Sequence, residues 1–324
     1  MTTRLAIAAA FALCGCVCMA AFTRLDAENV VRRRLVQRGL RQGVDSETGI
    51  HAVIASAVAQ QPSVCFRVAE LRAIHQLLNM RGQSMAGMTE VQRDAASKSA
   101  RTFVETLSQS DLDGCIVLDF EGRKVGDRYV ASVAVGWSDD FANRAQASAA
   151  GTIFPAKTWI DEFRAFLDAH RGGMMPSSVS FVDSAGFLHN VGIGTVRLDG
   201  DSALQRNTAA RMADLLARKN LSLALHGRSE MRKKAELMKS RNRVDDGQAL
   251  SSVYEALGNV SADGPLPVGS RPLFDMVNLV ENERFLSVVY GVDAPISSDT
   301  GREAVAEPSG VMIFNPNIGT YEKR

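Results

Sequence analysis

Apolar residues occupy every second position in two widely separated stretches of the chain, and this alternation predicts two β-hairpins. The first lies within residues 113–137, with a polar, glycine-containing turn at 122–127. The second joins residues 272–280 to residues 284–292 through a turn at 281–283. This two-residue period places one face of each sheet against a core. The mixed polarity of the other face suits a sheet that helices cover on one side only.

Apolar residues at three- and four-residue spacing predict helices along much of the remaining chain. The main segments are residues 25–41, 69–80, 90–108, 157–169, 202–226, 228–243 and 248–257. Alanines recur on one face within residues 95–108 and 209–224, and their small side chains would let these two helices lie close to a sheet. An alanine-rich helix therefore precedes each hairpin.

The same order of elements occurs twice, which suggests an internal repeat. Aligning Arg128 with Arg284 places residues 129–133 opposite residues 285–289, at a spacing of 156 residues. This period is longer than that of any solenoid, so it indicates two domains rather than an array. Chance similarity between two amphipathic hairpins is the alternative explanation.

These patterns predict an α+β fold with two helix-plus-antiparallel-hairpin domains, each a small mixed sheet covered by an alanine-rich helix. An N-terminal helix and an irregular C-terminal tail complete the prediction. The expected division is a targeting segment at 1–21, an N-terminal helical region at 22–60, a first α/β domain at 61–140, a helical connector at 141–176, a second α/β domain at 177–293 and the tail at 294–324.

The composition is that of a globular protein without a polyanionic partner. The chain has 324 residues, of which 46% are hydrophobic and 23% charged, and this excludes a disordered chain. Lys and Arg number 37 against 36 Asp and Glu, so the net charge is +1. A nucleic-acid-binding protein normally carries a basic surplus that neutralises phosphates. We therefore expect no nucleic-acid partner.

Residues 1–21 have the layout of a secretory signal, with Arg4 before an apolar run and small residues after it. Residues 13–16 resemble a lipoprotein signal in which Cys16 would be acylated. Ordinary cleavage after Ala20 is one alternative, and a retained N-terminal anchor is another. We expect an exported protein, periplasmic or anchored to the outer membrane, with membrane attachment through the N-terminal lipid or signal anchor.

The helix predicted at residues 25–41 is strongly basic. Its arginines are Arg32, Arg33, Arg34, Arg38 and Arg41. Clustered arginine favours anionic lipid headgroups, so this helix could lie on a membrane surface. The alternative is a helix face that is simply solvated.

Cys65 and Cys115 are the cysteines that remain outside the targeting segment. In an oxidising compartment they are candidates for a disulfide, and the chain-entropy model gives a loop of about 50 residues a stabilisation on the order of 4 kcal/mol. The alternative is two separate buried thiols, which pack as small hydrophobic groups.

The succession of strand, alanine-rich helix and hairpin behind an exported N-terminus resembles the twenty-kilodalton bacterial lipoprotein family. It is also similar to the N-terminal domain of flagellar assembly protein T. The likeness rests on residues 191–196, on Ala209, Ala213 and Ala217, on residues 284–289, and in the first half on residues 95–100 and 129–135. The resemblance implies an α/β envelope protein without established catalytic residues. The length of the chain and the insert at 138–176 depart from the short family pattern.

No catalytic or cofactor motif stands out. Gly192 and Gly194 follow a strand, but a dinucleotide fingerprint needs a third glycine where Arg197 stands. No G-x-S-x-G turn occurs, and the five histidines are isolated, at positions 51, 75, 170, 189 and 226. Asp119 and Glu121 follow two further aspartates, yet both are expected to face solvent rather than calcium. We predict no catalytic residues, no cofactor and no metal site.

Two functional hypotheses follow. The first is a non-enzymatic exported cell-envelope protein, a structural or protein-interaction module with a protein or cell-wall partner. Its contact surfaces would be hairpin edges and the aromatic residues Trp159, Phe163 and Phe166, for which core packing is the alternative explanation. The second is a periplasmic hydrolase with a site at the interface of the two domains. Histidines or carboxylates converging in a cleft between the domains would favour the hydrolase.

Overall fold

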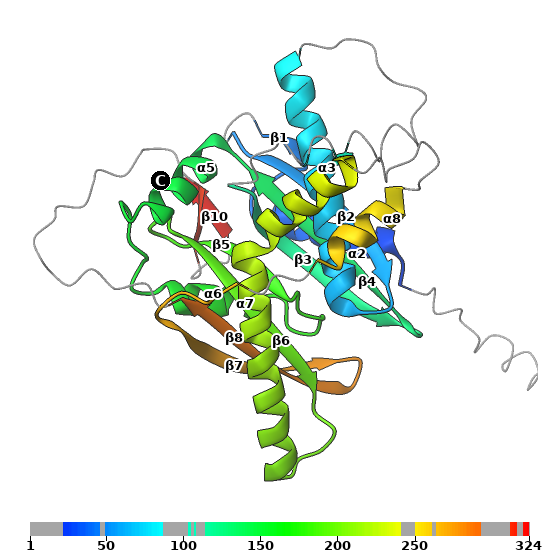
Figure 1. Cartoon of the computed structure of the whole chain (residues 1–324). Coiled ribbons are helices and arrows are strands. Elements are labelled where there is room, and N and C mark those ends of the chain that lie inside the picture. Colours follow the sequence, from blue (N-terminus) through cyan, green and yellow to red (C-terminus); the bar gives the residue numbers. More distant parts are fainter. Residues whose placement is uncertain are drawn as a thin grey trace, which may run out of the picture.

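The computed structural model describes residues 22–45, 49–86, 103–104, 107, 114–240, 250–260, 264–292, 312–315 and 320–323. The predicted targeting segment, including the acylation candidate Cys16, lies outside these residues. Figure 1 shows two sheets side by side with helices packed against them. This arrangement confirms the predicted α+β class.

Each half of the chain builds a four-stranded sheet and one long helix. The first unit comprises β1 (Gly43–Val44), β2 (His51–Ala59), α3 (Pro62–Ala86), β3 (Ile116–Val125) and β4 (Arg128–Trp137). The second unit comprises β5 (Ser178–Val182), β6 (Leu188–Arg197), α7 (Ala203–Ser240), β7 (Ser270–Val280) and β8 (Glu283–Val292). The remaining helices are α2 (Arg24–Gln37), α5 (Asp139–Ala149), α6 (Trp159–Asp168) and α8 (Leu250–Gly258).

The two sheets have the same strand order, β1-β2-β4-β3 and β5-β6-β8-β7. In both, the strand before the long helix pairs with the last strand of the hairpin. All of these pairings are antiparallel, so the expectation of mixed sheets was wrong. In each unit the long helix connects the second strand to the hairpin, and the strand that pairs with the second strand runs antiparallel to it.

The internal repeat is present, but its register differs by one residue from the alignment of Arg128 with Arg284. β4 begins at Arg128 and β8 at Glu283, and each follows a two-residue turn. Hairpin positions therefore correspond at a spacing of 155 residues. A slip of one residue exchanges the two faces of a strand, so the alignment by arginines set inward positions against outward ones.

A bulged leucine packed on a glycine marks this register in both units. The pairing of β3 with β4 shifts at Leu118, and that of β7 with β8 shifts at Leu273. A Cβ added at Gly136 would lie 2.7 Å from Leu118 Cδ1, and one added at Gly291 would lie 2.7 Å from Leu273 Cδ1. Both the leucines and the glycines are 155 residues apart. Such a specific arrangement, present twice, argues against chance similarity of two hairpins.

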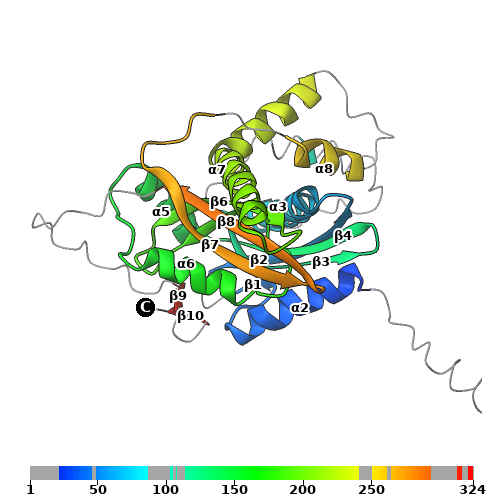
Figure 2. The same cartoon turned by 90° about the horizontal axis from the view of Figure 1, so that it is seen from below.

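Helices lie on both faces of the two sheets, contrary to the expectation of one covered face, and the edge strand β7 alone keeps an exposed face, at Val277 and Leu279, among the long described strands. In Figure 2, α3, α7 and α8 lie above the strands, and α2 and α6 lie below them. Burial on both faces explains why β4 is buried from Val130 to Trp137. In the first unit α3 covers the sheet. Of the predicted covering helix at 95–108 the structure describes Phe103, Val104 and Leu107, which are buried, and the rest of that segment lies outside the described residues.

α7 lies directly on β6 because glycines of the strand face alanines of the helix. A Cβ added at Gly194 would overlap the carbonyl oxygen of Ala213 and the amide nitrogen of Ala217. One added at Gly192 would overlap the backbone of the next turn. Ala213 and Ala217 are fully buried. The predicted role of this alanine-rich helix face is therefore confirmed.

The two units share one apolar core. A single cluster of buried residues extends from Val31 and Leu35 of α2 to Phe274 and Val289 of the second sheet. α7 connects the units further, because Arg228 Nη2 donates a 2.7 Å hydrogen bond to the carbonyl of Cys115. The units are repeats in sequence order, but they pack as one body.

Two predicted segments contain more regular structure than expected. The N-terminal helical region, 22–60, includes β1 and β2, and β2 lies in the interior of the first sheet. The tail at 294–324 was expected to be irregular, yet it contains a hairpin of β9 (Met312–Asn315) and β10 (Thr320–Lys323). Among the described residues, no helix combines the length and the hydropathy that crossing a bilayer requires.

Candidate binding cavity between the two units

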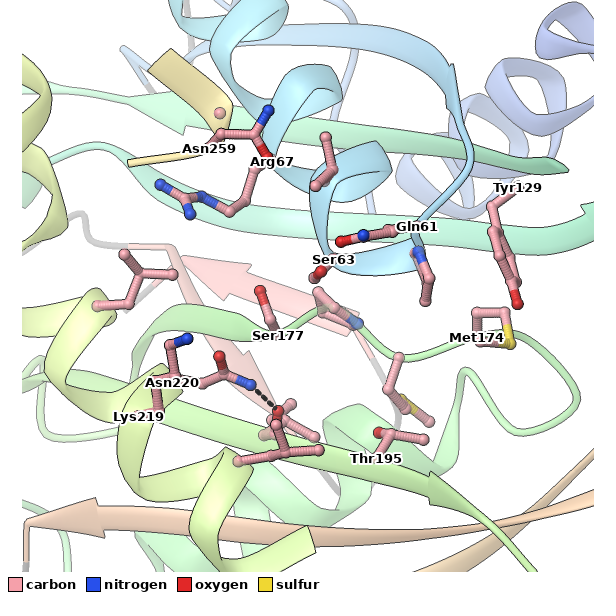
Figure 3. Close-up of a pocket in the computed structure, with 18 of the residues that line it drawn as sticks. Gln61, Ser63, Arg67, Tyr129, Met174, Ser177, Thr195, Lys219, Asn220 and Asn259 are labelled. Atoms are coloured by element: carbon pink, nitrogen blue, oxygen red, sulfur yellow. Dashed lines mark hydrogen bonds between the residues drawn. The ribbon is translucent and has the colours of Figure 1, made fainter. Parts of the chain in front are cut away.

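A cavity of about 360 Å³ lies where the two units meet, within the size range of small-molecule sites. Its walls come from the start of α3, the loop before β5, strands β4, β6 and β8, helix α7 and the end of α8. Figure 3 shows side chains of both units facing this space. The polar groups are those of Gln61, Ser63, Arg67, Tyr129, Ser177, Thr195, Lys219, Asn220 and Asn259.

The N-terminus of α3 opens onto the cavity. The first backbone hydrogen bond of this helix runs from Cys65 N to the Gln61 carbonyl. Pro62 has no N–H, so the first turn presents the amides of Ser63 and Val64, both of which line the cavity. No acidic residue occupies this turn, and the helix dipole therefore leaves a positive potential at its end.

Two cationic side chains add to this potential. Arg67 of α3 donates from Nη1 to the carbonyl of Val260 at 2.8 Å, which fixes its guanidinium at the cavity wall. Burial lowers the pKa of Arg67, and nearby Glu70 opposes that change. Burial also raises the pKa of Glu70, against the effects of Arg228 and Arg67. Lys219 of α7 is exposed at the opposite side.

Ser177 supplies an unpartnered hydroxyl. Its side chain is 7% exposed, and its Oγ has no hydrogen-bond partner among the described residues. Figure 3 shows the hydroxyl pointing from the loop before β5 towards the α3 side of the cavity. Buried hydroxyls in native proteins normally have a partner, so one without a partner at a cavity wall indicates a place for a ligand or water.

The rest of the wall is apolar. Met174, Met175 and Pro176 form a buried floor beside Ser177. Leu216 and Leu223 of α7 are among the apolar residues that line the cavity with them. The cavity therefore has a polar, positive end and an apolar surface. Chemically it can bind and orient an anionic group, and the described residues that line it include no histidine or carboxylate for acid–base catalysis.

The predicted interaction residues belong to the core instead. Trp159 is 4% exposed, and Phe163 and Phe166 are fully buried. Trp159 stacks on His189 at 3.9 Å between ring centroids, and Phe163 packs edge-on against Phe181 at 5.2 Å. The helical spacing of these aromatics reflects packing of α6 against the second sheet. A docking stripe on this helix was the wrong interpretation.

The two cysteines are not joined by a disulfide. Both are buried thiols. Cys65 Sγ donates to the carbonyls of Ala57 and Tyr129, at 3.3 and 3.2 Å, which holds it between β2 and β4. Burial raises the pKa of Cys65 to about 12. The structure therefore contains two separate buried thiols, which was the alternative prediction.

Arginines of α2 and acidic residues of β3 form an internal ion-pair network. Asp119 is fully buried, with Arg34 Nε at 3.1 Å and Arg38 Nη1 at 3.0 Å from its carboxylate. Glu121, 7% exposed, binds Arg34 Nη2 at 2.9 Å. The expectation that Asp119 and Glu121 face solvent was wrong. Of the five arginines named for the predicted helix at 25–41, Arg34 and Arg38 point inward to these carboxylates rather than to water or membrane.

The histidines take part in separate structural contacts. His170 Nε2 lies 3.3 Å from Asp119, and His189 Nε2 lies 2.9 Å from Asp183. His75 Nδ1 lies 2.6 Å from the Tyr254 hydroxyl, and burial lowers the pKa of His75 to about 4. No group of three or more metal-ligating side chains gathers within the described part of the chain.

The cavity residues could not be predicted from the sequence because no linear motif connects them. Arg67, Ser177 and Lys219 lie on three different elements, and only the fold brings them together. The one local signal is the turn at residues 60–63, where Pro62 occupies the first helical position, as prolines often do. That signal locates a helix start and says nothing about a ligand.

A hypothetical protein from Francisella tularensis has a similar fold. Its 2.3 Å crystal structure matches this chain with a TM-score of 0.53, at 13% sequence identity, over 83% of this chain and 90% of that one. A likeness at this identity concerns the fold alone. No protein-family model matches the chain, and no curated protein sequence matches it. The resemblance to the twenty-kilodalton lipoprotein family and to flagellar assembly protein T stays a prediction.

Proposed function

We propose that this chain is a non-enzymatic, exported cell-envelope protein that binds a partner through the cavity between its two units. The export component rests on the signal-like residues 1–21. The binding component rests on one observation, the cavity formed jointly by both units, whose lining combines cationic, hydroxyl and amide groups with apolar side chains.

A binding role accounts for this lining better than hydrolysis does. A hydrolase at the unit interface would need a general base beside a nucleophile. Ser63 and Ser177 line the cavity, but none of the histidine or carboxylate side chains of the described residues lines it with them. His75, His170 and His189 contact Tyr254, Asp119 and Asp183 instead.

Export is tested by cell fractionation. Wild-type protein expressed in bacterial cells should be found in the periplasmic or membrane fraction, and a variant lacking residues 1–21 should stay in the cytosol. Labelling with a radioactive fatty acid should mark the wild type and should be lost in Cys16→Ser. Cytosolic wild-type protein would refute the export component, and labelling that persists in Cys16→Ser would exclude Cys16 as the acylation site.

Partner binding is tested by photo-crosslinking in intact cells. A photoreactive amino acid at Gln61 or Asn259, both exposed at the cavity wall, should give crosslinked products that mass spectrometry identifies. The same amino acid at Lys157, exposed and outside the cavity, serves as the control. Identical products from all three positions would show that the cavity is not the binding surface.

A further inference from the structure

Three independent features line the part of the cavity between α3 and the loop before β5. The first is the N-terminus of α3, whose opening turn has no acidic residue. The second is the unpartnered hydroxyl of Ser177, more than nine-tenths buried. The third is the guanidinium of Arg67, which uses Nη1 on Val260 and retains further N–H donors. All three offer hydrogen-bond donors or positive potential, and the ligand group that satisfies them together is an anion.

The apolar lining beside Ser177 sets the rest of the ligand. Met174 and Met175 form a buried, adaptable wall, and Leu216, Leu223 and Phe285 line the cavity with them. An inorganic anion would leave this surface in contact with water. A ligand that combines an anionic head with an apolar chain would cover it.

From these contacts we propose that the cavity binds an amphiphilic oxyanion, with a carboxylate or phosphate head at the α3 N-terminus and an apolar chain along the methionine wall. The proposal rests on the proposed binding function and specifies its ligand class. The head would accept hydrogen bonds from the amides of Ser63 and Val64, from Ser177 Oγ and from Arg67. Lys219, exposed at the rim, would contribute long-range attraction.

The cavity volume limits the length of the chain. A volume of about 360 Å³ lies at the small end of the range for ligand pockets, about 300–1,000 Å³. A medium-chain fatty carboxylate fits this limit. A two-chain membrane lipid exceeds it, and could place only its head and the first part of one chain inside. The ligand could thus be a free amphiphile or a lipid drawn from a membrane.

Isothermal titration calorimetry of the purified protein tests the head group. Octanoate should bind with one-to-one stoichiometry. 1-Octanol, which has the same chain without the charge, should bind at least tenfold more weakly, as should inorganic phosphate, which has charge without the chain. Raising the salt concentration should weaken octanoate binding and leave octanol binding unchanged. Equal affinity for octanoate and octanol would overturn the anionic head while leaving a binding cavity.

Ser177→Ala is the sharpest variant. Its hydroxyl has no partner among the residues that the structure describes, so the substitution should leave the melting temperature unchanged or raise it, while octanoate affinity falls about threefold to tenfold. A residue with a merely structural role would change the melting temperature and not the affinity. Unchanged octanoate affinity in Ser177→Ala would remove this residue from the site and refute the proposed geometry.

Charge variants complete the test. Arg67→Gln should weaken octanoate binding tenfold or more, with circular dichroism confirming the fold. Lys219→Gln should weaken it twofold to threefold. Lys233→Gln is the matched control, because it removes the same charge from the same helix roughly 21 Å further along. Equal effects of the two lysine variants would show a general charge effect and count against the site.

Vesicle flotation distinguishes the two sources. Anionic phosphatidylglycerol vesicles and neutral phosphatidylcholine vesicles are compared with the wild type and with Ser177→Ala. Octanoate binding without flotation assigns a free amphiphile, and flotation that Ser177→Ala abolishes assigns a lipid. Flotation that is unaffected by Ser177→Ala, together with no octanoate binding, would overturn the proposal. The photo-crosslinks at Gln61 and Asn259 would still decide the proposed function separately.

Discussion

The close approach of α7 to β6 makes Gly194→Ala the most informative stability test. The added methyl group would overlap backbone atoms of Ala213 and Ala217, and backbone of a long buried helix cannot move aside as a side chain can. Non-bonded heavy atoms pack at about 3.5–4 Å, so α7 would have to withdraw from the sheet by roughly 1 Å or more. Withdrawal would also loosen the neighbouring contact at Gly192.

The magnitude follows from two opposing effects. Overpacking in a well-filled interior costs about 1–3 kcal/mol, and the rigid neighbour places this site near the upper end. Replacing glycine by alanine restricts the unfolded chain and returns about 0.4–1 kcal/mol. We therefore expect Gly194→Ala to lower the free energy of unfolding by about 2 kcal/mol.

Guanidinium unfolding followed by circular dichroism measures this change. Gly173→Ala is the matched control, because a Cβ there would have its nearest neighbours at 3.4 and 3.6 Å and the backbone φ is not positive. Its unfolding free energy should stay within about 0.5 kcal/mol of the wild type. If Gly194→Ala is as stable as Gly173→Ala, α7 does not rest on the backbone of β6.

Three further predictions concern buried polar groups. Burial lowers the pKa of His75 from 6.5 to about 4, so the unfolded chain binds the proton at a higher pH than the folded chain does. The free energy of unfolding should therefore fall as the pH drops from about 6.5 towards 4, by up to about 3 kcal/mol. Melting curves of His75→Gln should show a smaller loss over this pH range, and an identical pH dependence would contradict this. Asp119→Asn should cost about 3–5 kcal/mol in urea unfolding because it leaves two arginines without their carboxylate, whereas Asp168→Asn in an exposed pair should cost under about 1 kcal/mol; equal losses would exclude a special role for the buried network. Cys65→Ser and the wild type should show the same mobility on non-reducing gels, and a reduction-sensitive difference would reveal a disulfide.

The sequence predicted the fold class because alternation and helical spacing are local signals. The hairpins at β3–β4 and β7–β8 and the alanine face of α7 follow from them directly. The pattern could not reveal the register of the repeat, because a bulge at Leu118 or Leu273 shifts the alternation without changing composition. It also could not identify β2 as an interior strand, since a buried run of small residues has no period of its own.

The residues of the candidate site were harder to predict from the sequence, for a related reason. The helical spacing of Trp159, Phe163 and Phe166 is the same for a core face and for a docking face, so spacing alone does not distinguish the two. Arg67, Ser177 and Lys219 carried no signal, since each is ordinary in its local context. Asp119 and Glu121 were misplaced because their arginine partners come from a helix more than 80 residues earlier.

The shared apolar core has a consequence for how such a chain can be divided. Each half buries apolar surface against the other half, and separation would expose that surface to water. Neither half should therefore stay folded when a protease or a gene truncation separates the two. Heat should melt both halves in one cooperative step. A shorter relative carrying a single copy of the motif would need to dimerise, with a second molecule supplying the missing neighbour.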